Sequence, residues 1–139
     1  MVKNKTIKWV SKVAPALVQK KLDSIYGPIQ WRPRMVALDE LIFTVLTQHT
    51  SDLNAERAYD SLRKQFPTWG EVAEADPVNV EKSIHRGLIA YQKSVRIQSI
   101  LAEIVKRIGR FELEFLSDLP IEETREWLTT LPGLSLIHI

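Results

Sequence analysis

Three short segments of the chain combine polar or glycine residues in ways that could support chemistry. Residues 46–52 read Leu-Thr-Gln-His-Thr-Ser-Asp, and they follow a strongly apolar stretch. Residues 84–88 read Ile-His-Arg-Gly-Leu, with Lys-Ser-Val-Arg-Ile after them at 93–97. Residues 131–133 read Leu-Pro-Gly. Amides, imidazoles and cations supply hydrogen bonds and charge, and glycine permits tight turns. Taken singly, each segment is a weak signal: a Leu-Pro-Gly is usually only a helix stop, and a Gln-His-Thr is usually only a capped loop.

The composition excludes several classes of protein. The chain has 139 residues and no cysteine, so it holds no disulfide, no thiolate zinc site and no cysteine-ligated iron–sulfur cluster. Its three histidines are scattered and predict no metal site. Outside the C-terminal tail, no apolar run approaches the ~20 residues that cross a bilayer. No signal peptide pattern follows the basic N-terminus. We expect a cytoplasmic protein that does not contact membranes.

The small net charge of +2 conceals an uneven distribution. Residues 1–34 carry eight Lys or Arg against Asp23 alone, a net charge of +7, and the remainder carries −5. Within that remainder, residues 82–110 hold seven basic side chains and one acidic one, Glu103. Such clustering can attract a polyanion, although solvated helix faces are also commonly basic.

Apolar residues recur at three- and four-residue steps along most of the chain, which is the spacing of amphipathic helices. Local signals then mark the ends: Pro15 suits a first turn, Asp76-Pro77 and Ser51 suit helix starts, and Gly109 suits a helix end. No stretch alternates with a period of two. The pattern predicts an all-α fold, an orthogonal bundle of short helices. The expected ranges are 14–26, 37–48, 52–66, a short helix after Thr68, 77–86, 90–109 and 121–131.

In order and spacing, the three segments together resemble the endonuclease III family of DNA base-excision repair glycosylases, within the helix-hairpin-helix superfamily. That family has a Leu-Ser/Thr-Gln-x-Thr-x-Asp signature, then Gly-Leu-x-x-x-Lys-Ala-x-x-Ile, then a Leu-Pro-Gly-Val-Gly hairpin. The counterparts here are 46–52, 87–97 and 131–133, with Ser94 in place of the usual alanine. The resemblance covers roughly residues 36–133.

The resemblance implies that double-stranded DNA with a damaged base or an abasic site is the partner. Such enzymes rotate the target base out of the duplex. Gln48 would then fill the vacated space, and Leu88 would act as a wedge near the opposite strand. His49 and Thr50 beside Gln48 are further candidates for DNA contact.

The third segment would contact the DNA backbone rather than its bases. In the hairpin, Leu131, Pro132 and Gly133 would let backbone N–H groups hold a phosphate. Lys93 would add phosphate attraction, as would Arg96, and binding would then depend strongly on salt. For each of these two residues, a solvated helix face is the competing interpretation.

The residues that carry the family's reaction are absent. A lysine after the hairpin would attack the sugar C1′, and a later aspartate would assist, but neither follows Gly133 here. We therefore expect no catalytic residue in this chain. In many members the region beyond the hairpin also carries four cysteines around a 4Fe–4S cluster. That cluster is thus expected only in a complete protein, and this chain needs no cofactor.

The resemblance also suggests a domain organisation. Residues 1–34 would form a basic helix and connector, and 35–133 a partial six-helix glycosylase domain, truncated at the hairpin. Residues 134–139 resemble the translation of a transposon-end sequencing adapter, which predicts a non-native tail on a truncated gene. Without a second hairpin helix, Leu128 and Leu131 would lack cover, and we expect a marginally stable monomer.

Two other functions remain open from the sequence. A MutY-like adenine glycosylase would lack the lysine nucleophile and only hydrolyse the base–sugar bond; the segment from Gly87-Leu88 to Lys93 favours the endonuclease III type instead. The chain could also be a non-catalytic helical DNA-binding or protein-interaction domain.

Overall fold

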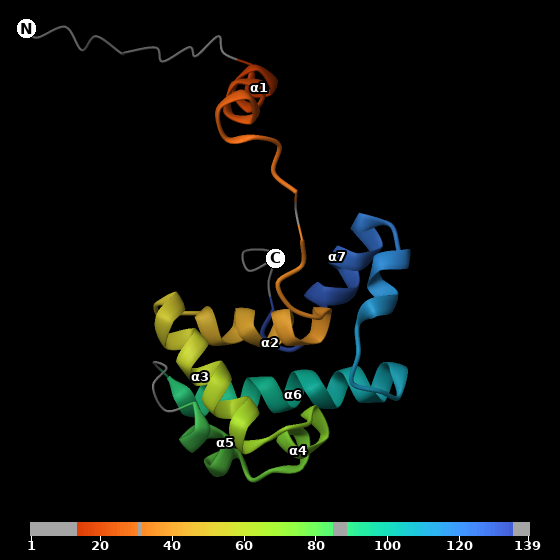
Figure 1. The fold of residues 1–139 in the computed structure, drawn as a ribbon. Coiled ribbons are helices and arrows are strands. Elements are labelled where there is room, and N and C mark those ends of the chain that lie inside the picture. The colour runs from red at the N-terminus through yellow and green to blue at the C-terminus, as the bar shows by residue number, and fades with distance from the viewer. Residues whose placement is uncertain (1–13, 31, 85–88, 135–139) are drawn as a thin grey trace, which may run out of the picture. The chain divides into compact units, whose positions relative to one another are not determined.

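A computed structural model describes residues 14–30, 32–84 and 89–134 (Figure 1). The described residues are helical and contain no strand, which confirms the all-α prediction. They belong to two compact units, one within residues 1–33 and the other within 34–139. No helix in the described ranges combines the length and apolar character needed to cross a membrane.

The described residues of the first unit form one helix, α1 (Pro15–Tyr26). Pro15 occupies its first turn, where the missing N–H costs nothing, and Gly27 ends it with a φ of 79°. Both ends agree with the sequence prediction. No residue of α1 is buried, and Leu17, Val18, Leu22 and Ile25 are all exposed.

The second unit contains the remaining helices, and it includes every residue of the three segments that the structure describes. Its elements in chain order are α2 (Ala37–Thr47), α3 (Asp52–Gln65), α4 (Trp69–Glu74), α5 (Pro77–Ser83), α6 (Ala90–Ile108), the 3₁₀ helix η1 (Glu114–Asp118) and α7 (Ile121–Thr129).

Side-chain caps fix where three of these helices begin. Ser51 accepts a hydrogen bond from the Asn54 N–H at the start of α3. Thr68 and Glu71 form a reciprocal capping box on α4. These contacts satisfy N–H groups that have no partner inside the helix. Asp76 does the same for α5, where Pro77 follows it. The predicted starts are confirmed.

One helix end and one additional element differ most from the sequence prediction. Helix α5 ends at Ser83 instead of residue 86, because the chain leaves helical geometry at Ile84. Ile84 is fully buried, so packing rather than a glycine signal terminates this helix. The 3₁₀ helix η1 was not predicted, since five residues carry too short a pattern to distinguish it from a linker.

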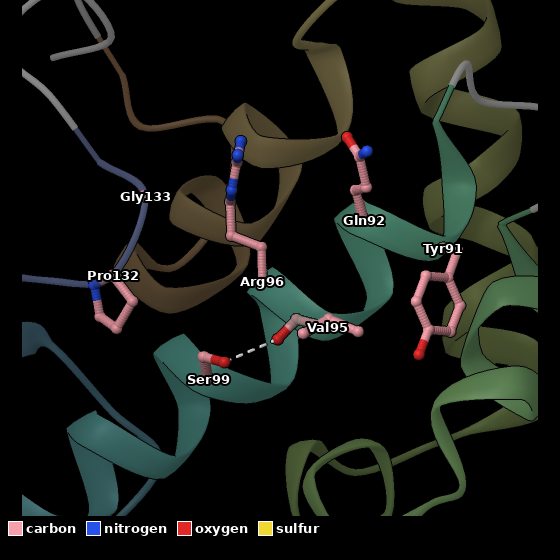
Figure 2. A pocket seen from close by; sticks show the side chains of 7 residues that line it. All are labelled: Tyr91, Gln92, Val95, Arg96, Ser99, Pro132 and Gly133. Carbon is pink, nitrogen blue, oxygen red and sulfur yellow. Dashed lines mark hydrogen bonds between the residues drawn. The ribbon is translucent and has the colours of Figure 1, made fainter.

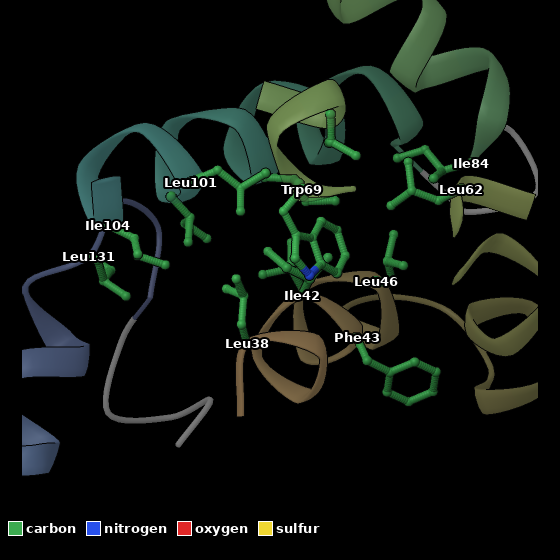
Figure 3. Packing of buried hydrophobic residues seen from close by; sticks show 14 of the residues in the cluster. Leu38, Ile42, Phe43, Leu46, Leu62, Trp69, Ile84, Leu101, Ile104 and Leu131 are labelled. Carbon is green, nitrogen blue, oxygen red and sulfur yellow. The ribbon is translucent and has the colours of Figure 1, made fainter. Parts of the chain in front are cut away.

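Helix α6 lies at the centre of the second unit and packs against α2, α4 and α5 (Figure 1). Its inner stripe of Ile97, Ile100, Leu101 and Ile104 is fully buried. Trp69 from α4 joins the same apolar cluster, together with Leu38, Ile42 and Leu46 of α2 (Figure 3). Each fully buried aliphatic side chain contributes about 1.5–3 kcal/mol. This cluster therefore holds the helices of the unit together.

Polar side chains of α6 also satisfy carbonyl groups at the ends of neighbouring helices. Gln98 donates from its amide nitrogen to the carbonyls of Val72 and Ala75, at 2.9 and 2.7 Å, where α4 ends. Arg107 donates to the Thr130 carbonyl at 3.3 Å, where α7 ends. Because the last carbonyls of a helix have no partner within it, these bonds fix how α4 and α7 approach α6.

The expectation that Leu131 lacks cover is wrong. Leu131 is 2% exposed and packs in the core, and Leu134 beside it is 7% exposed. Leu128 is partly buried against the same cluster. The segment after α7 turns back toward α6, so residues of this chain cover these side chains.

We expect Ile100→Val to lower the free energy of unfolding by about 0.5–1.5 kcal/mol, since it removes one methyl from a fully buried site. The matched control is Ile121→Val, because Ile121 is 73% exposed and should change stability by less than about 0.5 kcal/mol. Urea denaturation of both variants measures the difference. Equal losses would contradict the assigned core.

Candidate nucleic-acid interface

The segment 46–52 forms the corner between α2 and α3. Gln48 is the residue at which α2 ends, and His49 adopts a left-handed conformation with a φ of 57°. Histidine tolerates this region better than β-branched residues do. His49 is exposed, whereas Thr50 is partly buried and donates its N–H to the Thr47 carbonyl at 3.2 Å. The corner thus places Gln48, His49 and Thr50 together, as the sequence predicted for a helix end.

Lys93 is buried, with only 3% of its surface exposed. Its ammonium donates a hydrogen bond to the Leu46 carbonyl at 2.7 Å, and that carbonyl belongs to the last turn of α2. A positive charge also interacts favourably with the negative end of a helix dipole. Burial lowers the pKa of Lys93, and the nearby Arg96 charge lowers it further.

This position corrects both interpretations offered for Lys93 from the sequence. The side chain is not on a solvated helix face, and its ammonium binds a backbone carbonyl where a phosphate contact was expected. The sequence could not predict that Lys93 is buried. A lysine is rarely buried without a partner, and here the partner lies 47 residues away in the chain. Lys93 positions the corner rather than forming its surface.

Arg96 lies one turn further along α6 and reaches the same corner. Its guanidinium donates to the Gln48 amide oxygen at 2.5 Å. Gln48 is 8% exposed, and its amide nitrogen is buried with no hydrogen-bond partner among the described residues. An unpartnered buried amide costs about 1–3 kcal/mol. The Gln48 side chain is therefore held on one side only.

Gly133 brings the third segment to Arg96. Its φ is +73°, and a Cβ atom built on it would lie 2.5 Å from the Arg96 Nε. Glycine thus suits the turn, and an alanine there would be strained and would displace the Arg96 side chain. Figure 2 shows Pro132 and Gly133 beside the face of α6 that carries Arg96 and Ser99, where a shallow pocket of about 320 Å³ opens.

The remaining predicted residues divide between surface and core. Pro132 and Gly133 are exposed, but the Leu131 side chain is buried in the core and anchors the turn instead of facing a ligand. Ser94, which replaces the usual alanine, is fully buried and donates to the Tyr91 carbonyl at 2.7 Å, so its hydroxyl is satisfied. Leu88 lies outside the described residues, so its role as a wedge stays a prediction.

The sequence match around Leu88 also needs a correction. Four residues separate Leu88 from Lys93, one more than the family pattern has. Counting back from Lys93 puts Ile89 at the place of the pattern's leucine. Ile89 is 43% exposed, precedes α6 and has a φ of 61°. That conformation is an outlier for a β-branched residue, and such strain is concentrated at functional sites.

Sequence reasoning did not predict the contact between Arg96 and Gln48 or the position of Ile89 before α6. The residue count before Lys93 would have indicated Ile89. Nothing local indicates that Arg96 joins Gln48 to Gly133, because these residues lie far apart in the chain. In the described ranges, no three His, Cys, Asp or Glu side chains gather closely enough to hold a metal ion.

Comparison with known proteins found one class of relative. No protein-family model matches the chain. A curated Arabidopsis thaliana protein named "Putative DNA glycosylase" is 36% identical over 97 residues, which are 70% of this chain and 33% of that protein. The chain therefore spans about a third of the length of this relative. The name of the relative does not specify endonuclease III.

We compare the free energy of unfolding of the chain with that of a Lys93→Met variant. We expect the difference to change in favour of the unaltered chain as the pH rises toward 10.5. The unfolded lysine keeps its proton up to its ordinary pKa of 10.5, whereas the folded one loses it at lower pH. The unfolded state then binds more protons, so the free energy of unfolding increases with pH. Urea denaturation of both proteins across this range measures the effect. A constant difference would indicate an exposed Lys93.

Proposed function

We propose that this chain is the DNA-recognising helical part of a DNA glycosylase, and that it binds duplexes containing a damaged base or an abasic site. The observation that carries the proposal is the convergence of Gln48, Arg96 and Gly133 on one face of the second unit. The similarity to the Arabidopsis relative supports the same class.

The chemistry of this face suits a duplex from which one base has been extruded. An amide such as that of Gln48 both donates and accepts, so it can pair with the base left without a partner. Arg96 offers a planar fork for a phosphate, and the exposed Pro132-Gly133 turn permits close approach of the DNA backbone. These contacts position the duplex without reading its sequence.

A wedge residue completes the proposed interface. Extruding a base requires its neighbours to be parted, which apolar branched side chains can do. The segment 87–89 offers two candidates, Leu88 and Ile89. Ile89 is the one for which the structure describes an exposed side chain, next to the first turn of α6.

We further propose that the complete protein is of the endonuclease III type, removing a damaged base and then cleaving the strand. No lysine or aspartate follows Gly133 in this chain, so we assign no catalytic residue within it. A 4Fe–4S cluster, if the complete protein carries one, would need ligands outside these 139 residues, since they contain no cysteine.

We expect the chain to bind a duplex with a tetrahydrofuran abasic analogue more tightly than the intact duplex. Gln48→Ala should reduce this preference by about fivefold to tenfold, the worth of one hydrogen bond to the orphaned base. Its affinity for intact duplex should change little. Fluorescence anisotropy with both duplexes measures the ratio.

Gln65→Ala is the matched control, because Gln65 is an exposed glutamine at the end of α3. It should leave the preference unchanged. Equal binding of the two duplexes by the unaltered chain, or an unchanged preference in Gln48→Ala, would contradict the proposed role.

We also expect no Lys93-dependent adduct when the chain is treated with borohydride on abasic DNA. A lysine with a lowered pKa is the usual Schiff-base nucleophile, and Lys93 has that property. However, its ammonium is buried against the Leu46 carbonyl and does not reach the surface. An adduct that disappears in Lys93→Met would refute this assignment.

A further inference from the structure

We propose that Arg96 is the positioning residue for Gln48: it holds the Gln48 amide inside the free protein and releases it when its guanidinium binds a phosphate of the duplex. This inference rests on the proposed function, since it assigns a task to Gln48 that only DNA binding would require. It concerns how the interface changes between its free and bound forms.

Among the described residues, the Gln48 side chain makes one hydrogen bond. Its amide oxygen accepts from Arg96, while its amide nitrogen has no partner among the described residues. A glutamine that is 8% exposed would normally have both ends of its amide satisfied. The inward position therefore has little to stabilise it once the arginine turns elsewhere.

Arg96 is able to exchange the Gln48 amide for a phosphate. Its side chain is partly exposed and lines the shallow pocket between α6 and the Pro132-Gly133 turn (Figure 2). A guanidinium has five N–H donors, and Gln48 takes one of them. A phosphate accepts two parallel bonds and carries charge, and such bonds are about twice as strong as neutral ones. A phosphate in the pocket would thus displace the neutral amide.

The surroundings of Arg96 favour an incoming anion. Lys93 lies one turn away on α6 and is buried, and the Arg96 charge contributes to the lowered pKa of Lys93. A phosphate bound at Arg96 would offset this repulsion between two cations. Gly133 meanwhile leaves room for the arginine, since a Cβ there would lie 2.8 Å from the Arg96 Cδ.

The first experiment observes Gln48 directly in the free chain. The side-chain amide resonance of Gln48, identified by its loss in Gln48→Ala, is recorded by NMR in the unaltered chain and in Arg96→Met. We expect a shift in Arg96→Met, which keeps the aliphatic packing but removes the donor. Addition of intact duplex should shift the resonance of the unaltered chain in the same direction and leave that of Arg96→Met nearly unchanged.

The second experiment measures binding. Arg96→Met should weaken binding of intact duplex by about threefold to tenfold and reduce the slope of log affinity against log salt by about one, as expected for one lost phosphate contact. Gly133→Ala should also shift the Gln48 resonance, because it displaces the arginine while preserving its charge. This second variant keeps the test valid if Arg96→Met folds poorly.

Arg110→Met is the matched control. It makes the same substitution and charge change just beyond α6, where Arg110 is 62% exposed and paired with Glu112. It should leave the Gln48 resonance unchanged. If Arg110→Met and Arg96→Met shift the resonance equally, the inference is overturned.

The remaining outcomes separate this inference from the proposed function. If the unaltered chain prefers the abasic duplex but its Gln48 resonance does not respond to duplex, release by Arg96 is wrong and the proposed function stands. If it binds no duplex, the proposed function fails. In that case, the free-state comparison with Arg96→Met alone decides whether Arg96 holds Gln48.

Discussion

The hydrogen bond from the Lys93 ammonium to the Leu46 carbonyl sets the geometry on which the candidate interface depends. Placing a lysine at 3% exposure is costly, and the contact with the negative end of α2 offsets much of that cost. Because the bond fixes the last turn of α2 against the first turns of α6, it also fixes where the chain leaves α2. Gln48 lies two residues after Leu46, directly beyond the end of α2.

Helix α6 combines the core and the interface in one element. Its inner stripe is buried among α2, α4 and α5, and its polar side chains satisfy carbonyls at the ends of α2, α4 and α7. A helix held at so many points is a rigid support. Arg96 projects from it to the edge of the core, where the α2–α3 corner and the Gly133 turn meet.

Two residues of the candidate interface adopt unfavourable arrangements, in contrast to the well-packed α6 that supports them. Gln48 has an unsatisfied buried amide, and Ile89 adopts a backbone conformation that branched residues rarely take. Both features cost free energy in the free protein, and both belong to residues that the proposed function uses. Under the proposed function, in which the interface reorganises around an extruded base, a free state that is not at its most stable arrangement is an advantage.

The sequence by itself determined the helices and most of their ends. Periodic apolar residues, Pro15, Ser51 and Asp76 act within a few residues of themselves, so their effects can be read locally. Sequence also predicts Gln48 and Gly133 as interface residues, because their types and order resemble a known family. It did not predict the early end of α5 or the short η1, which packing decides.

Only the tertiary structure decided what Lys93, Arg96 and Leu131 do. Their types suggested two phosphate contacts and one DNA contact. Instead, the Lys93 ammonium is buried against a carbonyl 47 residues away, and Leu131 lies in the core. Arg96 donates in the free protein to an amide 48 residues away. The role of a charged or apolar side chain depends on the groups that folding brings near it, and here those groups are distant in the chain. The spacing of residues along the sequence does not predict these contacts.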